Sequence, residues 1–296
     1  MQEVNQSVYE KYIEQVKSAV ERKTGKSVAV EKVSKNNGLV LDSLTILSED
    51  ENISPRIYLN DFFNEYLTNG VNAAAEKIIQ IYEEYRVKRS IDTSFFTDIE
   101  KVKPNIKMKL VNYEKNKELL EKVPHERFLD LAITFTVALE SDYGAASIPI
   151  YNDHLELWGI DAEDLYNIAM ENTTYDYDIV PMQDIIGGFI DMEYVRDSKI
   201  KMSVLSNRPR MCGAAGMLHT EVLDNYLQKK RLEKILIFPS SIDEVILFSS
   251  NMQEDMEDIG WAKNMVKEIN RTTLAADEVL SDNVYIYDGN KVTIAE

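Results

Sequence analysis

The chain has 296 residues, and its 33 lysines and arginines against 51 aspartates and glutamates give a formal net charge of -18. A chain of this length holds one large domain or two moderate ones. The negative charge argues against binding of nucleic acid or of an anionic membrane through the bulk surface. The single cysteine, Cys212, excludes an intramolecular disulfide framework.

No run of the sequence has the length and apolar character of a membrane span, and the first residues, MQEVNQSVYEKY, lack the apolar core of a secretory signal. A single cysteine also fits a reducing compartment. We therefore expect a cytoplasmic protein that binds no membrane. The acidic residues are spread along the chain, so an acidic inhibitor that mimics DNA is a minor alternative.

The first third of the sequence predicts a helix, a hairpin and a second helical region. Apolar residues recur at helical spacing over residues 8–20, and two β-rich runs, 28–33 and 39–47, flank the pair Asn37-Gly38. An Asn-Gly pair supplies the positive φ angles that a hairpin turn needs. The sequence thus begins with a helix followed by a hairpin.

A third strand is expected over residues 57–59, and a short aromatic-rich helix should end at Gly70. The helix predicted over residues 71–86 has the clearest apolar stripe of the chain, with Ile78 and Tyr82 on its buried face. Its opposite face is charged, so we expect that face in solvent.

The middle of the sequence predicts short helices and a second hairpin. In chain order these are a helix over 93–102, a strand over 106–111, a helical turn before Pro124, a hairpin of 128–139 with 145–150, a helix over 152–158 ended by Gly159, and a helix capped by Asp161. Residues 176–196 favour a loop with a short helix.

The last third is organised around residues 201–251, which predict a strand, a polar loop, a helix and two strands. The first strand ends at the loop Ser206-Asn-Arg-Pro-Arg210, and the small residues of Gly213-Ala-Ala-Gly216 permit close packing before the helix. A strand–helix–strand unit favours a right-handed parallel crossover, whereas the short link between the runs 235–238 and 245–248 permits only an antiparallel return. The predicted sheet is therefore mixed.

The end of the sequence predicts a helix and a hairpin. The helix covers residues 252–269, with Ile259, Met265, Val266 and Ile269 inward, and the terminal hairpin covers residues 285–294.

The predicted fold class is α+β or mixed α/β. An N-terminal helix–hairpin–helix unit over residues 1–123 precedes a C-terminal unit over residues 124–296, which contains the crossover and the terminal hairpin. The link from Leu120 to Pro124 is short and not rich in Gly or Ser, so we expect the two units to pack as one rigid body.

Four segments carry a resemblance to a known family. They are Asn112-Tyr-Glu-Lys-Asn, Pro124-His-Glu-Arg-Phe-Leu-Asp-Leu-Ala, His154-Leu-Glu-Leu-Trp-Gly and Phe238-Pro-Ser-Ser-Ile-Asp-Glu-Val-Ile-Leu. Nearly the whole chain resembles the bacterial family of unknown function numbered 5688, and residues 154–172 with the central stretch resemble more faintly the family numbered 1444. The resemblance implies a bacterial, cytoplasmic protein and transfers no catalytic residue.

The candidate ligand site lies where two predicted strands end. Since parallel strands present their carboxyl ends at one edge of a sheet, the loop with Asn207, Arg208 and Arg210 should lie beside the turn with Ser240 and Ser241. The arginines and the following helix start favour a small anionic group. Pairing of the arginines with surface carboxylates is the alternative.

His154 is a further candidate, because it stands with polar neighbours at a junction between a strand and a helix; a helix cap is the alternative. Cys212 is followed by a helix start, which would lower the pKa of a thiol, whereas a buried, inert cysteine is the more ordinary state. The Ser-x-x-Glu spacing at Ser241 is that of a capping box. The histidines lack the spacing of a metal site, and no Gly-rich phosphate loop occurs, so we expect neither metal nor cofactor.

Two classes of function remain open. No catalytic set has the required spacing, which favours a non-enzymatic interaction or regulatory module that binds a protein partner or a small anionic effector. The alternative is a hydrolase or transferase that uses His154, Asn207, Arg210 and Ser240. Direct binding of nucleic acid is not expected.

Overall fold

The computed structural model describes residues 6–48, 54–86, 93–141, 144–173, 176–186, 200–250 and 259–296. It is an α+β protein with two compact units. Unit 1 comprises Met1–Lys35 and Leu39–Ser94, and unit 2 comprises Asn36–Gly38 and Phe95–Glu296. Among the helices of these ranges, none is long and apolar enough to cross a membrane.

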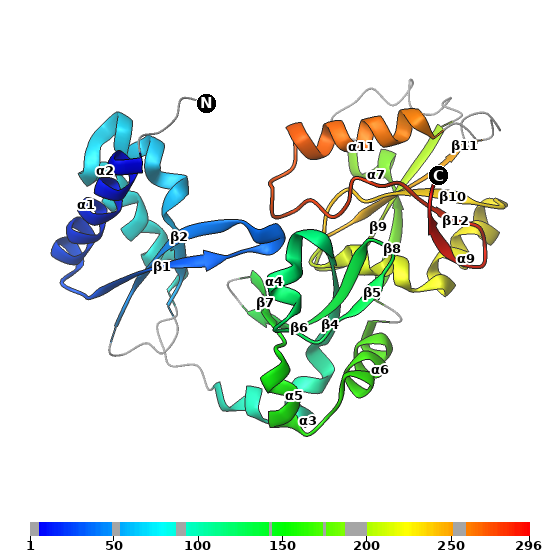
Figure 1. The fold of residues 1–296 in the computed structure, drawn as a ribbon, viewed down its shortest axis with the longest axis horizontal. Coiled ribbons are helices and arrows are strands. Elements are labelled where there is room, and N and C mark those ends of the chain that lie inside the picture. Colours follow the sequence, from blue (N-terminus) through cyan, green and yellow to red (C-terminus); the bar gives the residue numbers. More distant parts are fainter. Residues whose placement is uncertain are drawn as a thin grey trace. The chain divides into compact units, whose positions relative to one another are not determined.

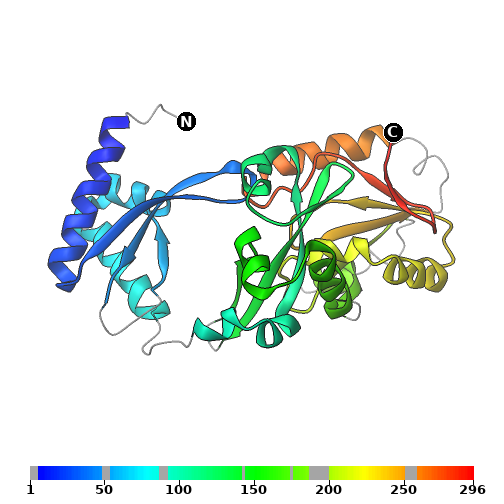
Figure 2. The same cartoon turned by 60° about the horizontal axis from the view of Figure 1, so that its bottom comes forward.

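Unit 1 packs two helices against a three-stranded antiparallel sheet, in which β1 (Val28–Ser34) pairs with β2 (Val40–Ile46) and β2 with β3 (Arg56–Tyr58). The helices α1 (Gln6–Thr24) and α2 (Phe63–Tyr85) lie side by side over the sheet in both views (Figures 1 and 2). The expected helix, hairpin and third strand are thereby confirmed. Tyr12 and Ile78, one from each helix, are fully buried in the shared core.

A break inside α2 separates the two helices that the sequence predicts. Gly70 has φ 82 and ψ 177, a conformation that is almost exclusive to glycine. The predicted stop at Gly70 is therefore confirmed, although the second helix resumes without a loop between them.

The first sheet of unit 2 is also antiparallel and is built on the long strand β6 (Leu131–Ser141). It pairs with β4 (Ile106–Asn112), β5 (Glu126–Phe128) and β7 (Gly144–Pro149). We expected one strand from residue 128 to 139. Instead the backbone turns at Leu129, where φ is 57, so residues 126–128 form a separate short strand against the start of β6.

Short helices precede this sheet, connect two of its strands and follow it. They are η3 (Thr93–Thr97), α3 (Ile99–Val102), η4 (Lys103–Asn105), η5 (Glu114–Asn116), α4 (Lys117–Leu120), α5 (Asn152–Trp158) and α6 (Ala162–Thr173). Asp161 caps α6 as predicted, because its Oδ1 accepts a hydrogen bond from the Asp164 N–H at 2.8 Å.

The second sheet of unit 2 has six strands in the order β13-β12-β10-β11-β9-β8. Their bounds are β8 (Tyr177–Pro181), β9 (Ile200–Asn207), β10 (Ile235–Phe238), β11 (Val245–Ser250), β12 (Tyr285–Tyr287) and β13 (Val292–Ile294). The terminal hairpin of β12 with β13 is confirmed. Residues 176–196 were expected to form a loop with a short helix. The described part instead contains the strand β8, followed by a short helix, and residues 187–199 lie outside the described residues.

The crossover departs from the prediction in one respect. β9 and β10 run in the same direction, but β11 lies between them and pairs with both in antiparallel fashion. Every described pair of this sheet is therefore antiparallel, and the expected mixed sheet is wrong. The return strand β11 lies between β9 and β10 instead of pairing on the outer side of β10.

Helices cover both faces of the second sheet (Figure 1). Leu236 and Phe248 pack with α11 (Gly260–Thr272), whereas Ile237 and Leu247 pack with α9 (Thr220–Lys230) and the first sheet. The side chain of Ile269, which we expected inward, is 39% exposed, so the end of α11 turns this residue away from the sheet. Residues 251–258 of the expected helix lie outside the described residues. The short helices α7 (Met182–Ile186) and η6 (Gly213–Leu218) complete unit 2.

The tip of the first hairpin belongs to unit 2 by its contacts. The Asn37 side-chain amide donates to the carbonyl oxygens of Ala276 at 2.8 Å and Val279 at 2.7 Å, and the Asn37 N–H donates to Asn116 Oδ1 at 2.9 Å. The units thus divide at Ser94, and at this tip, rather than at residue 123. Leu120 and Val123, beside the expected boundary, are buried inside unit 2.

Candidate functional site

A cavity of about 600 Å³ opens where β9 ends, and we call it the Asn207 cleft. It lies wholly within unit 2, between the loop after β9 and the strands β4 and β6. Its lining comprises Pro104, Asn105, Lys107, Thr136, Ala138, Leu139, Asp176, Asn207, Arg208, Pro209, Met211 and Cys212. A volume of this size is in the ordinary range of small-molecule sites.

The Asn207 side chain holds the loop in shape. Its Nδ2 donates to the Met211 carbonyl oxygen at 2.8 Å, and its Oδ1 accepts from the Met211 N–H at 3.0 Å. The loop also contains two non-glycine residues with positive φ, Arg210 at 50° and Cys212 at 58°. A non-glycine residue keeps a positive φ only where surrounding contacts hold it there, so this wall of the cleft is preformed.

The turn between β10 and β11 fixes the other end of this loop. The Asp243 Oδ1 accepts from the Cys212 N–H at 2.7 Å, and the Asp243 carbonyl oxygen accepts from Ser206 Oγ at 2.7 Å. Gly213 lies so close that an added Cβ would stand 2.4 Å from the Asp243 carbonyl oxygen. The predicted close packing of Gly213 and the predicted shared edge of loop and turn are both confirmed.

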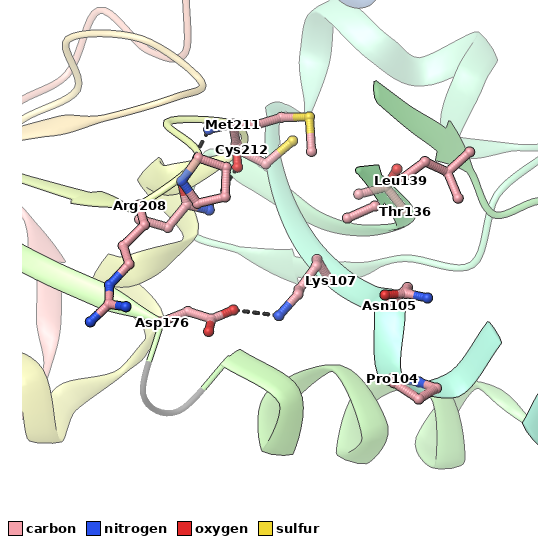
Figure 3. Close-up of a pocket in the computed structure, with 12 residues that line it drawn as sticks. Pro104, Asn105, Lys107, Thr136, Leu139, Asp176, Arg208, Met211 and Cys212 are labelled. Atoms are coloured by element: carbon pink, nitrogen blue, oxygen red, sulfur yellow. Dashed lines mark hydrogen bonds and ion pairs between the residues drawn. The ribbon is translucent and has the colours of Figure 1, made fainter. Parts of the chain in front are cut away.

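The charged side chains of the cleft are Lys107, Asp176 and Arg208 (Figure 3). Lys107 Nζ pairs with the Asp176 carboxylate and donates a second hydrogen bond to the Asn172 carbonyl oxygen at 3.1 Å. The Arg208 side chain is 88% exposed and lies 3.8 Å from the Asp178 carboxylate. Among the described residues that line the cleft, two cations therefore stand with one carboxylate, and the Asp178 carboxylate that pairs with Arg208 lies outside this lining.

The other predicted residues of this region lie beside the cleft and do not line it. Arg210 pairs with Glu244 at 3.6 Å, which is the surface pairing that we held as the alternative. Ser241 Oγ accepts from the Asp243 N–H at 3.1 Å, and the Ser240 N–H donates to the Phe238 carbonyl oxygen at 2.9 Å. Ser241 thus satisfies local backbone donors, as its spacing suggested, although the segment is a turn and not a helix.

His154 is placed apart from these residues, at the start of α5. Its Nδ1 accepts from the Tyr151 N–H at 3.0 Å, and its ring stacks on Trp158 with 5.5 Å between centroids. Burial lowers the pKa of His154. This arrangement is the helix cap that we held as the alternative, and His154 is not among the described residues that line the cleft.

Cys212 lines the cleft but is buried, and burial raises the pKa of its thiol to about 11. The thiol form therefore predominates at neutral pH, which makes this cysteine a weak nucleophile. Within the described ranges, no three His, Cys, Asp or Glu side chains are grouped so as to hold a metal ion.

Sequence reasoning missed Lys107, Thr136 and Asp176. The strand pairing sets Lys107 opposite Thr136, on the same face of the first sheet. No spacing of residues along the chain predicts that this face packs near the loop after β9. A lysine and a threonine that interrupt otherwise apolar strands were the available signal.

No curated protein and no solved structure matches the chain. The model of one protein family, the family of unknown function DUF5688, matches residues 9–289 and thus nearly the whole sequence, including the β9 loop and the cleft. The chain belongs to the family of unknown function DUF5688.

Proposed function

We propose that this protein is a non-enzymatic regulatory module of the bacterial cytoplasm that binds a small anionic effector in the Asn207 cleft. The observation that carries the proposal is the sign of the charge in the cleft. Among the described lining residues, Lys107 and Arg208 are accompanied by one carboxylate, Asp176, in a chain whose formal net charge is -18. A positive cavity on so negative a protein is suited to one small anion and repels extended polyanions at longer range.

Both cations have capacity left for a ligand. Lys107 Nζ has three N–H groups, and its contacts to Asp176 and to the Asn172 carbonyl oxygen use two of them. The ion pair of Arg208 with Asp178 is exposed, so exchanging it for a ligand requires little free energy. The backbone of the cleft is fixed by Asn207, which reduces the ordering that binding must supply.

An enzymatic function is less well supported by the geometry. The proposed catalytic set would need His154 close to Ser240, and His154 instead caps α5 and stacks on Trp158. The buried Cys212 thiol has a raised pKa, which argues against a cysteine nucleophile in the cleft. A binding role uses the groups of the cleft as they stand.

The test is a titration of the full chain with inorganic phosphate, succinate and a nucleoside monophosphate, followed by calorimetry and by thermal unfolding. We expect saturable binding of at least one probe and a rise of the unfolding temperature with its concentration. Arg208→Gln should weaken that binding roughly tenfold, since it removes one charge-assisted contact.

Arg210→Gln is the matched control. It removes the same charge from the same loop, but Arg210 pairs with Glu244 and does not line the cleft. Its affinity should equal that of the parent protein. An equal loss of affinity in the two variants would mean that the arginines act only through the general charge of the surface, which contradicts a specific role of Arg208. Failure of all three probes to bind would contradict the proposal as a whole.

A further inference from the structure

A second cavity of about 490 Å³ lies on the opposite side of unit 2's first sheet from Lys107, between β5, β6 and helix α6. Its polar lining consists of His125 and Glu126 at β5 with Glu163, Tyr166 and Asn167 on α6. It shares no lining residue with the Asn207 cleft. The two cavities also differ in charge, because the described residues that line this one include two carboxylates and no lysine or arginine.

The fold directs these side chains to one place. Glu126 pairs with Ile133 across the strands, and Ile133 is buried in the core that α6 also enters, so Glu126 lies on the α6 side of the sheet. Glu163 and Asn167 are four residues apart on α6 and therefore share a face of that helix. Ala162 beside them has too small a side chain to fill the space.

His125 is available only as an acceptor in its neutral form. Its Nδ1 is 3.1 Å from the Val123 carbonyl oxygen, and because a carbonyl oxygen can only accept, Nδ1 holds the proton. Nε2 is then left with its lone pair. The imidazole and the two carboxylates of this cavity thus all offer acceptors to a ligand.

An aromatic wall completes the cavity. Tyr166 packs edge-on against the buried Phe135, with 6.5 Å between ring centroids. Tyr166 and Glu126 both line this cavity, and burial, and after it the charge of Glu126, raises the pKa of Tyr166. An aromatic face beside carboxylates attracts a cation both through its ring quadrupole and through the neighbouring charge.

We propose that this cavity, named here the His125–Asn167 cavity, binds a small organic cation that carries a guanidinium or primary ammonium group. Such a group donates several N–H bonds, which matches the acceptors that Glu126, Glu163 and the neutral His125 ring present in this lining. The net charge of -18 attracts cations from solution to the protein as a whole. The inference does not depend on the anion site, which lies on other residues.

The experiment uses the full chain and agmatine, which carries both cationic groups, with butylurea as a neutral probe of similar shape. Calorimetry and NMR titration should show saturable binding of agmatine and none of butylurea, with the affinity falling as NaCl is raised. The double variant Glu126→Gln with Glu163→Gln should weaken agmatine binding roughly tenfold or more.

Two further variants make the outcome decisive. Glu171→Gln removes an exposed carboxylate of the same helix outside the cavity and should leave the affinity unchanged. Ala162→Leu fills the cavity without altering its charge and should abolish binding, while thermal unfolding reports that each variant is folded. Equal weakening by Glu171→Gln, undiminished binding to Ala162→Leu, or equal binding of butylurea would overturn the proposal.

Discussion

Gly213 shows how a single residue fixes the wall of the Asn207 cleft. A Cβ at this position would lie 2.3 Å from Ser206 Oγ, 2.4 Å from the Asp243 carbonyl oxygen and 2.9 Å from the Asn207 N atom. Two of these neighbours, the Asp243 carbonyl oxygen and the Asn207 N atom, are backbone atoms and cannot rotate away. We expect Gly213→Ala to lower the free energy of unfolding by about 1–3 kcal/mol, as overpacking of a tight site does. Urea denaturation measures this change.

The matched control is Gly25→Ala. A Cβ at Gly25 meets no heavy atom within 4 Å, but φ there is 68°, so this variant reports only the strain of a left-handed backbone. Anion binding separates the two variants further, because only Gly213 touches the loop of the cleft. An unchanged affinity in a folded Gly213→Ala protein would show that the loop tolerates displacement.

His219 gives unit 2 a pH dependence. Burial lowers the pKa of His219, and its Nε2 lies 2.9 Å from Thr173 Oγ1, which itself donates to the Ala169 carbonyl oxygen. Below pH about 6.5, the ordinary pKa, the unfolded chain takes up a proton before the folded one does. The free energy of unfolding should therefore fall between about pH 7 and pH 5. His219→Gln should reduce the slope of the free energy of unfolding against pH, as measured by denaturant titrations. An equal slope in the variant would show that another group causes the pH dependence.

Among the helices and strands, α2 contributes the side chain of Ile78 to the core of unit 1, and a substitution there measures how much this packing stabilises the fold. Ile78 is fully buried among residues of α1 and the sheet. Ile78→Ala removes buried methyl groups and leaves a cavity, so the free energy of unfolding should fall by about 2–5 kcal/mol. Glu84→Ala, an exposed change on the same helix, should stay within about 0.5 kcal/mol. Similar values for the two variants in chemical denaturation would place Ile78 outside the core.

Elements that depend on local chemistry could be predicted from the sequence. Asn37-Gly38 predicts a hairpin and Gly70 a break, because few residues adopt those backbone angles. The place of β11 could not be predicted, since a short link fixes its direction but not the side on which it pairs. The sequence likewise predicted only the residues of the cleft that local chemistry places. Asn207 and Arg208 follow a strand end, whereas Lys107 reaches the cleft only through the packing of two sheets.

For the whole molecule, the net charge of -18 opposes the compact state. Raising NaCl from about 0.01 M to about 0.15 M shortens the screening length from about 30 Å to about 8 Å and weakens repulsion among the surface carboxylates. We expect the free energy of unfolding to rise over this range, measured by urea denaturation at fixed pH. A flat or falling response to salt would contradict the prediction.

The hairpin tip Asn36–Gly38 ties the completion of unit 2 to the order in which the ribosome makes the chain. Asn37 is synthesised 239 positions before Ala276 and 242 before Val279, whose carbonyl oxygens accept from its amide. Domains generally fold as they emerge, starting from the N-terminus, but contacts so distant in sequence form late. Unit 1 can therefore close early in translation, whereas the Asn37 amide remains in water until residues 276–279 have left the ribosome.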